Sequence, residues 1–189
     1  MARPKSDDKR DALVAAAARV IAAQGLSAPT AVIAKEAGVA NGSLFTYFET
    51  KTDLFSRAYL DLKTRMAAAA LDGLQAEAPL RDQLAHMWWN WMRWATTYPD
   101  QRRALALLDV SGDITPQSRA ASHQAMADAA VILERARAGG PMREVPMEFA
   151  LALMSSLADT TMDFMIGDPD YAEHHCQAGF AALTRMLGC

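Results

Sequence analysis

Apolar residues recur along this chain at helical spacing, and glycine, proline or short polar runs separate the segments that carry them. The first segment predicts a helix over residues 7–24, because apolar positions three and four apart lie on one face. Those positions are Leu13, Ala17, Val20 and Ile21. Gly25 is expected to stop this helix. No segment alternates apolar and polar residues as a half-buried strand does, so the chain is predicted to be all-α.

The stretch GVANGSLFTYF, residues 38–48, first suggests a different structure. Asn-Gly between apolar residues is a strong hairpin signal, but a lone two-stranded hairpin is only marginally stable in water. A helix over residues 41–48 places Val39, Leu44 and Phe48 on one side, which is the better interpretation.

The remaining breaks in the pattern predict the other helices. Thr30 is expected to cap a helix over residues 30–37, and Gly38 to end it in the left-handed conformation. Thr50 and Asp53 have the spacing of a capping box at the start of a helix. Together the later breaks predict helices over residues 51–75, 80–97, 99–110, 116–138, from Pro146, and from Pro169 to about Gly188, giving about nine in all.

Composition and charge narrow the class of protein. Half of the 189 residues are hydrophobic, which is enough for a sizeable core. Residues 1–65 carry ten Lys or Arg against seven Asp or Glu, whereas the rest carry nine against fifteen. A basic N-terminal third favours a polyanionic partner there. Charged residues are expected to interrupt every apolar run, and no apolar leader follows Met1 to Lys5, so we expect a cytoplasmic protein without a membrane anchor.

The chain offers little for catalysis or metal binding. Two cysteines cannot form a disulfide framework. His174, His175 and Cys176 are adjacent, and adjacent side chains on a helix point about 100° apart, so they cannot converge on one ion. No catalytic motif or glycine-rich phosphate loop accompanies the four histidines. We therefore expect neither an enzyme nor a cofactor or metal.

Two short helices joined by a tight turn can place the second helix in the DNA major groove. Six apolar residues are expected to fix the angle between these helices: Ile33, Ala37, Val39, Leu44, Phe45 and Phe48. The outward residues are then Asn41, Gly42, Ser43, Thr46 and Tyr47, and small polar side chains allow close approach to base edges. Lys51, at the next helix start, suits a phosphate. Taken singly, these side chains could equally be ordinary helix surface.

Residues 30–54, which read TAVIAKEAGVANGSLFTYFETKTDL, strongly resemble the N-terminal domain of the TetR family of bacterial transcriptional regulators. The resemblance covers residues 7–60 in motif detail. It implies a homodimer of all-helical subunits, each with a three-helix DNA-binding domain and a divergent C-terminal domain. It also implies repression of a DNA operator, relieved when a small-molecule effector enters the C-terminal domain. On this basis we expect domains over residues 1–50 and 51–189.

The resemblance also suggests roles for individual residues. Thr30 and Tyr47 look like phosphate contacts, and Lys51 looks like the family's lysine at the following helix start. The positions similar to base-reading ones are Ala40, Asn41, Gly42, Ser43 and Thr46. Ala40 departs from the Ser or Thr often found before the recognition helix, so Asn41 is expected to supply the cap. Asn41 also replaces a common Lys or Arg, which leaves the operator sequence open.

The four tryptophans lie within residues 88–94 of one predicted helix. Aromatic and Met side chains are typical of a pocket for an apolar or planar ligand, but they equally form cores. Residue type favours core packing, and the resemblance favours a pocket for some of them. The candidate effector-binding residues are Met66, Trp88, Trp91, Met92, Met126, Met154, Leu157 and Met162. We expect a largely hydrophobic or aromatic effector.

The last two predicted helices suit self-association, because small and apolar residues recur on them at helical spacing. Their candidate dimer-interface residues are Ser155, Ala158, Cys176, Gly179, Phe180 and Leu183. The alternative is that these faces pack on the chain itself. At the level of function, the sequence also allows a DNA-binding regulator without a small-molecule effector, and activation as well as repression.

Overall fold

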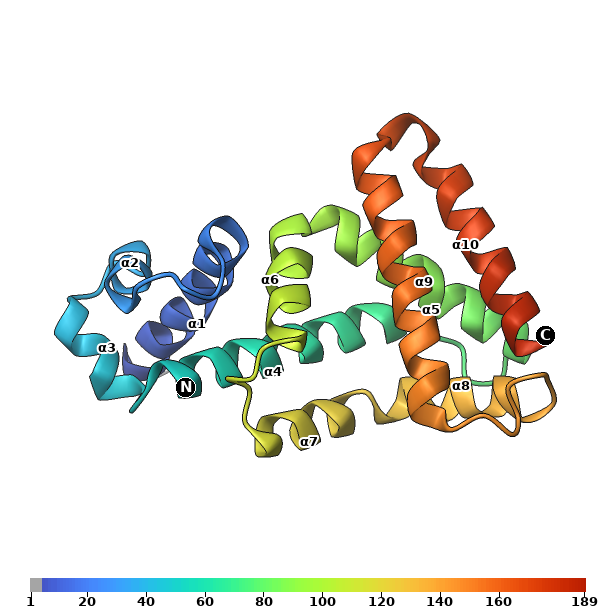
Figure 1. Cartoon of the computed structure of the whole chain (residues 1–189), viewed down its shortest axis with the longest axis horizontal. Helices are drawn as coiled ribbons and strands as arrows, with labels where there is room; N and C mark the ends of the chain where they lie inside the picture. Colours follow the sequence, from blue (N-terminus) through green and yellow to red (C-terminus); the bar gives the residue numbers. More distant parts are fainter. Residues whose placement is uncertain (1–4) are drawn as a thin grey trace. The chain divides into compact units, whose positions relative to one another are not determined.

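The computed structural model describes residues 5–189, apart from the side chains of residues 5, 6 and 41. Within this range the chain is helical and contains no strand, as Figure 1 shows, so the all-α prediction is confirmed. The helices are α1 (Lys5–Gln24), α2 (Thr30–Glu36), α3 (Asn41–Tyr47), α4 (Lys51–Leu71), α5 (Leu80–Thr97), α6 (Pro99–Asp109), α7 (Pro116–Ala125), α8 (Ala127–Ala138), α9 (Met147–Gly167), the 3₁₀ turn η1 (Pro169–Tyr171) and α10 (Ala172–Leu187).

Most of the predicted helix ends are confirmed. Gly25, Gly38 and Gly188 have φ values of 79°, 68° and 81° and follow α1, α2 and α10, as expected for glycines that end helices. Thr115 accepts a hydrogen bond from the Ser118 amide at 3.2 Å, which caps α7. Residues 1–4, on which the expectation of no apolar leader partly rests, lie outside the described range.

Four details of the prediction are wrong. The helix expected over residues 51–75 ends at Leu71, because Gly73 takes a φ of 74°. The helix expected over residues 116–138 is two helices, since Met126 leaves helical geometry with φ −95° and ψ 2°. Pro29 and Ala40, rather than Thr30 and Asn41, occupy the N-cap positions of α2 and α3, and neither cap makes a side-chain hydrogen bond.

Residues 5–65 and 98–125 form one compact unit, which holds α1, α2, α3, α6, α7 and the first part of α4. Helix α1 packs against both α2 and α6. Its core contains the fully buried side chains Leu13, Ile21, Ile33, Leu44, Leu54, Phe55 and Leu108. This core supports α2 and α3 from one side and leaves their other side in solvent.

Residues 66–97 and 126–189 form a second compact unit, in which α5 contacts α8, α9 and α10. Helices α9 and α10 lie side by side in Figure 1 and pack along one another. Trp88, Met92, Leu133, Met162 and Leu187 are fully buried here. The aromatic segment of α5 therefore lies at the centre of this unit.

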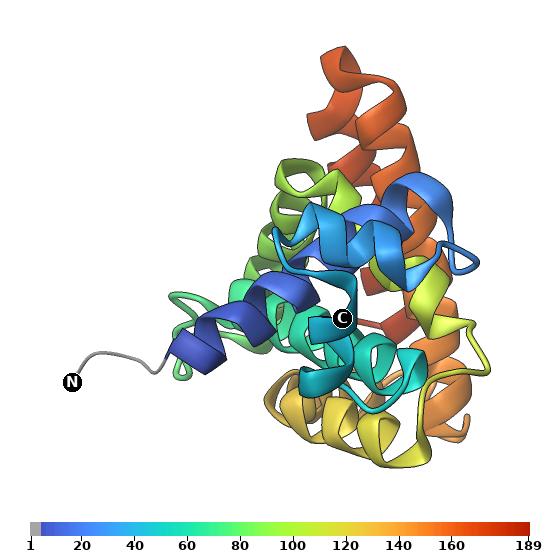
Figure 2. The same cartoon turned by 90° about the vertical axis from the view of Figure 1, so that its left-hand side faces the viewer.

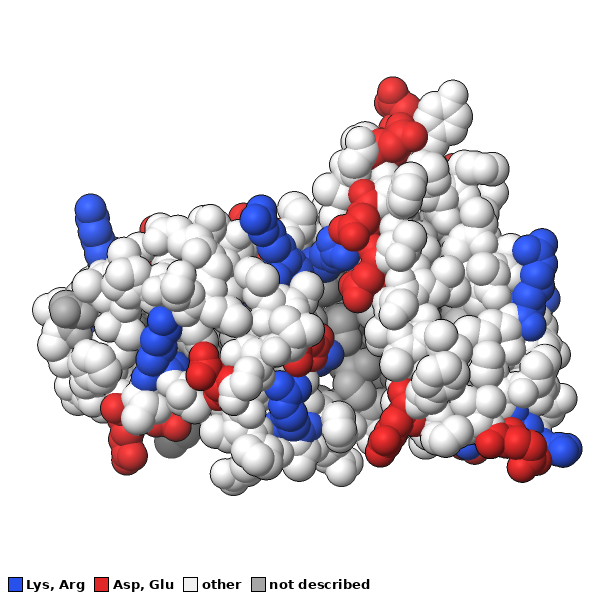
Figure 3. All heavy atoms as spheres, in the orientation of Figure 1, with Lys and Arg blue, Asp and Glu red and all other residues white. Residues whose placement is uncertain are grey.

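The expectation that no segment forms a membrane anchor bears most on helix α9, whose apolar sequence is interrupted by Glu148, Asp159 and Asp163. This helix is long and apolar enough to cross a membrane by length and composition alone, with a mean hydropathy of 1.3 in its best window. Only 22% of that window is buried within the chain. Figure 3 shows acidic side chains along this helix, whose exposed residues include Glu148, Asp159 and Asp163.

Candidate nucleic-acid interface

Two backbone hydrogen bonds fix the turn that joins α2 and α3. The Val39 amide donates to the Ala34 carbonyl at 3.0 Å, and the Gly38 amide donates to the Lys35 carbonyl at 3.1 Å. This pair of bonds around a left-handed glycine is a Schellman motif. It fixes the direction in which the chain leaves α2, so α3 begins at a defined angle. Figure 2 shows the three N-terminal helices from the side that faces α2 and α3.

The predicted DNA-contacting residues lie at the start of α2, on α3 and its N-cap, and at the start of α4. Ala40, Gly42 and Thr46 are exposed, whereas Thr30, Ser43, Tyr47 and Lys51 are half-buried. The backbone of Asn41 begins α3, but its side chain lies outside the described part of the structure. All the positions whose side chains are described are therefore at least partly accessible to solvent. Their roles in DNA binding stay predictions.

Phe45 differs from its predicted place. The sequence predicts an inward position for Phe45, yet 52% of its surface is exposed, while Leu44 and Phe48 are buried. Leu44 and Phe48 are four residues apart and lie on the same face of α3, and Phe45 is turned about 100° away from Leu44. Helical spacing around Leu44 was the signal that could have placed Phe45 outside.

Polar contacts hold the helix-turn-helix against its surroundings. The Arg19 guanidinium donates to Glu36 at 2.8 Å and links α1 to the end of α2. Arg10 lies over the Phe48 ring, with its guanidinium carbon 5.4 Å from the ring centre. Arg10, Arg19 and Glu36 are exposed, so each contact contributes modestly to stability. Together they orient α2 and α3 on α1.

The start of α4 forms the capping box expected from the sequence. The Asp53 amide donates to Thr50 Oγ1 at 3.1 Å, and the Thr50 amide donates to Asp53 Oδ2 at 3.0 Å. Lys51 has a structural contact that its sequence position did not indicate. Its Nζ donates to the Leu26 carbonyl at 2.8 Å and lies 5.0 Å from the centre of the Phe55 ring. One of its three N–H groups is therefore engaged within the protein.

The candidate effector-binding residues all lie in the second compact unit. Met66, Trp88, Met92 and Met162 are buried, and Trp91, Met126, Met154 and Leu157 are half-buried. The Trp88 indole N–H donates to the Cys176 carbonyl at 3.1 Å, and its ring meets Trp91 edge to face at 6.4 Å. Trp88 is thus a satisfied core residue in the structure. The half-buried members are the ones a ligand could reach without unpacking this core.

Four of the six predicted dimer-interface residues, Ala158, Cys176, Gly179 and Leu183, are buried inside one chain. A Cβ atom added at Gly179 would lie 2.4 Å from Thr161 Oγ1 and 2.7 Å from the Trp88 ring, so glycine allows α10 to approach α9 and α5. Burial raises the pKa of the Cys176 thiol to about 12. Ser155 is exposed and Phe180 half-buried, which leaves these two nearer the outer surface.

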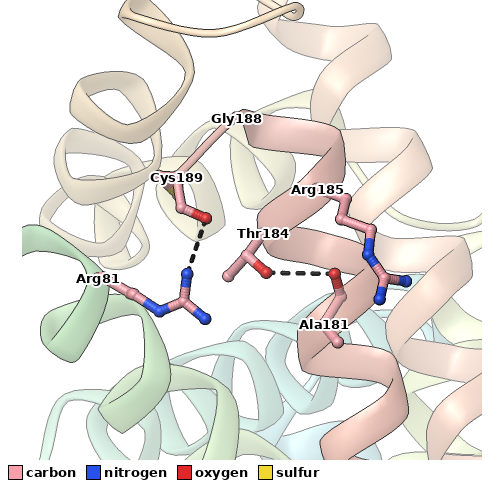
Figure 4. A pocket seen from close by; sticks show the side chains of 6 residues that line it. All are labelled: Arg81, Ala181, Thr184, Arg185, Gly188 and Cys189. Atoms are coloured by element: carbon pink, nitrogen blue, oxygen red, sulfur yellow. Dashed lines mark hydrogen bonds between the residues drawn. The ribbon is translucent and has the colours of Figure 1, made fainter.

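Figure 4 shows a surface hollow that no pattern in the sequence predicts. It has a volume of about 380 Å³ and lies between α5 and the end of α10. Its lining residues are Arg81, Ala181, Thr184, Arg185, Gly188 and Cys189, and the Arg81 guanidinium donates to the Cys189 carbonyl at 3.1 Å. None of the candidate effector-binding residues lines it.

Solved structures with this fold come from several bacteria. A proposed tetR family transcription regulator from Shewanella sp. PV-4 is 24% identical, with a TM-score of 0.83 over 93% of this chain and 95% of that chain. A TetR family regulator from Marinobacter aquaeolei VT8 is 23% identical, with a TM-score of 0.81 over 96% and 98%. A TetR-family regulator from Haemophilus influenzae RD is 18% identical, with a TM-score of 0.71 over 95% and 98%. These likenesses show the fold.

A sequence model of the family described as bacterial regulatory proteins, tetR family, matches residues 13–58. This range includes the end of α1, the whole helix-turn-helix and the first turns of α4. The resemblance noted in the sequence is confirmed by this match and by the fold of the whole described chain. Residues 13–58 therefore match the model of the tetR family of bacterial regulatory proteins, and the described chain has the fold of solved TetR-family transcription regulators.

Proposed function

We propose that this protein represses transcription as a homodimer bound to a palindromic DNA operator, and that a small hydrophobic or aromatic effector releases it. The observation that carries the proposal is the outward surface of α3. Small exposed residues there, Gly42 and Thr46 among them, are presented at an angle fixed by the Schellman turn. A short helix so held suits the major groove, which is wide enough to admit it.

Charge and side-chain chemistry support this use of α3. The net charge of residues 1–65 is positive on a chain whose overall charge is −3, which favours approach of this segment to DNA. In the proposed complex Tyr47, Thr30 and Lys51 contact phosphates, and residues 40–43 with Thr46 contact base edges. Lys51 would use the N–H groups that remain beside its bond to Leu26.

Dimerisation follows from the geometry of DNA. Two recognition helices reach successive major grooves on one side of the duplex when they lie about 34–36 Å apart. We propose that outer surfaces of α9 and α10, including Ser155 and Phe180, form the contact between subunits. The weakly buried apolar sequence of α9 supports this assignment.

For the effector we propose the half-buried part of the aromatic and Met cluster, with Trp91, Met126, Met154 and Leu157 at the entrance. Aromatic and thioether side chains suit a hydrophobic or planar molecule. Such a ligand relieves repression only if it binds the DNA-free arrangement more tightly than the DNA-bound one. The proposed division of labour places DNA binding in residues 1–50, effector binding and dimerisation in residues 51–189, and the protein in the cytoplasm.

The test is binding of the purified protein to labelled duplexes that cover the DNA flanking its own gene, followed by fluorescence anisotropy. We expect one palindromic site to bind with one dimer, and Thr46→Glu to abolish this binding because it places a carboxylate on the exposed side of α3. Gln117→Glu, which makes a similar charge change on exposed α7, is the matched control and should bind normally.

Small aromatic and hydrophobic compounds are then added while tryptophan fluorescence is followed. Release of DNA together with a fluorescence change supports the effector-controlled repressor. If no compound alters DNA binding, the second candidate is favoured, which is a DNA-binding regulator without a small-molecule effector. The buried packing of Trp88 supports this second candidate. Equal binding by the Thr46→Glu and Gln117→Glu variants would contradict the proposed DNA surface.

A further inference from the structure

Phe45 is the large apolar side chain that remains exposed in the described part of residues 5–65. More than half of its surface, 52%, is in contact with solvent, although the neighbouring Leu44 is fully buried. An aromatic ring left in water forgoes the free energy gained by burial. A partner outside the chain that covers this ring would gain that free energy.

The surroundings of Phe45 leave room for that partner. Gly42 is three residues earlier and lies beside it on the helix surface. A Cβ atom added at Gly42 would meet no atom within 4 Å, so the space next to the ring is open. Thr46, the following residue, is also exposed. In Figure 3 the part of the surface over α2 and α3 that faces the viewer is mostly uncharged.

We propose, on the basis of the proposed DNA-binding function, that Phe45 packs on the C5-methyl group of a thymine in each operator half-site and so determines specificity. The thymine methyl is the apolar feature that base pairs present in the major groove. A phenyl ring carries no hydrogen-bond donor, so it cannot bind a phosphate oxygen in that way. Packed on a guanine or cytosine edge, it would cover donors and acceptors without pairing them.

The experiment removes the methyl group alone. A randomised duplex library first yields the strongest site for the wild-type protein, and each thymine of that site is then replaced singly by deoxyuridine. We expect one replacement in a half-site to weaken wild-type binding about fourfold, which is the effect of exposing one methyl group. The Phe45→Ala variant should bind the original site more weakly and should be insensitive to that same replacement.

Two further variants keep the result interpretable. Tyr47→Phe alters a neighbouring residue of α3 and should retain the wild-type dependence on the thymine methyl. Phe45→Leu keeps an apolar side chain and should retain part of it. Because Phe45 is exposed, helical circular dichroism is expected to be unchanged in its variants.

The proposal is overturned if no deoxyuridine replacement weakens wild-type binding. It is also overturned if the replacement that weakens wild-type binding weakens binding of the Phe45→Ala variant by the same factor. It is also overturned if Phe45→Ala changes the oligomeric mass of the DNA-free protein, since a second copy would then cover the ring. Failure of the wild-type protein to bind any duplex in the library is a different result. It would reject the proposed DNA-binding function itself.

Discussion

Two helical glycines, Gly42 in α3 and Gly179 in α10, occupy opposite environments. A Cβ atom at Gly42 would meet nothing within 4 Å, whereas one at Gly179 would collide with Thr161 and Trp88. Gly179 is buried among α5, α9 and α10, and Gly42 is exposed. The absent side chain at Gly179 permits packing within the chain, while the absent side chain at Gly42 leaves space at the surface.

This contrast extends to the regions around the two glycines. Around α3 the outward Phe45 and Thr46 are exposed, and the buried Leu44 and Phe48 lie behind them. On α5 the rings of Trp88 and Trp94 are buried, and the Trp88 indole N–H donates to the Cys176 carbonyl. The first region leaves its outer side in solvent, and the second stabilises the fold by packing within the chain.

The largest expected effect breaks the inward-facing region. Trp88→Ala removes a fully buried ring and its hydrogen bond, and should lower the free energy of unfolding by about 3–5 kcal/mol. Trp89→Ala, at an exposed position one residue away, is the matched control and should cost much less. Urea unfolding followed by far-UV circular dichroism measures both. If the two variants lost similar amounts of unfolding free energy, the difference in burial between Trp88 and Trp89 would be contradicted.

A smaller effect is expected from Gly179→Ala. The added methyl group must displace Thr161 or the Trp88 ring, and overpacking of this kind lowers the free energy of unfolding by about 1–3 kcal/mol. Gly42→Ala is the same chemical change in open space, so it serves as the control. Thermal unfolding of the two variants compares them directly. If Gly179→Ala were as stable as the wild type, the close contact of α10 with α5 and α9 would be looser than described.

Gly42→Ala should have the smallest effect on stability and a measurable one on DNA. Alanine favours helix over glycine by up to about 1 kcal/mol, so the free energy of unfolding should stay unchanged or rise slightly. Its methyl group would occupy the space beside Phe45, so affinity for the operator should fall. Anisotropy titration with the selected duplex measures this. Undiminished affinity would indicate that DNA does not approach this point of α3.

The sequence predicted the ends of helices well where glycine or a polar cap determines them. The capping box of Thr50 and Asp53 and the left-handed Gly25 and Gly38 are local features, so neighbouring residues suffice to identify them. The break at Met126 had no such signal, because neither proline nor glycine stands there. The alanine-rich run before Leu71 favours a longer helix, whereas Gly73, with a φ of 74°, ends α4 there.

The sites were harder to predict. A helical pattern shows which residues share a face of a helix, but it does not show what packs against that face. Ala158, Cys176 and Leu183 have the spacing of a contact surface, and packing within the chain uses that surface. Likewise the spacing of the tryptophans could not show that Trp88 is buried and Trp89 exposed. Lys51 was predicted from its position at a helix start, but its bond to Leu26 joins residues 25 apart in the sequence.

The two thiols give the protein a practical property for spectroscopy. Cys176 is fully buried and burial raises its pKa to about 12, so it carries almost no thiolate at neutral pH. Cys189 is partly accessible, and burial raises its pKa as well, so mildly alkaline buffer favours its reaction. A maleimide dye should therefore attach at one position of the unmodified chain. A homodimer labelled in this way would report its own assembly by energy transfer between the two dyes.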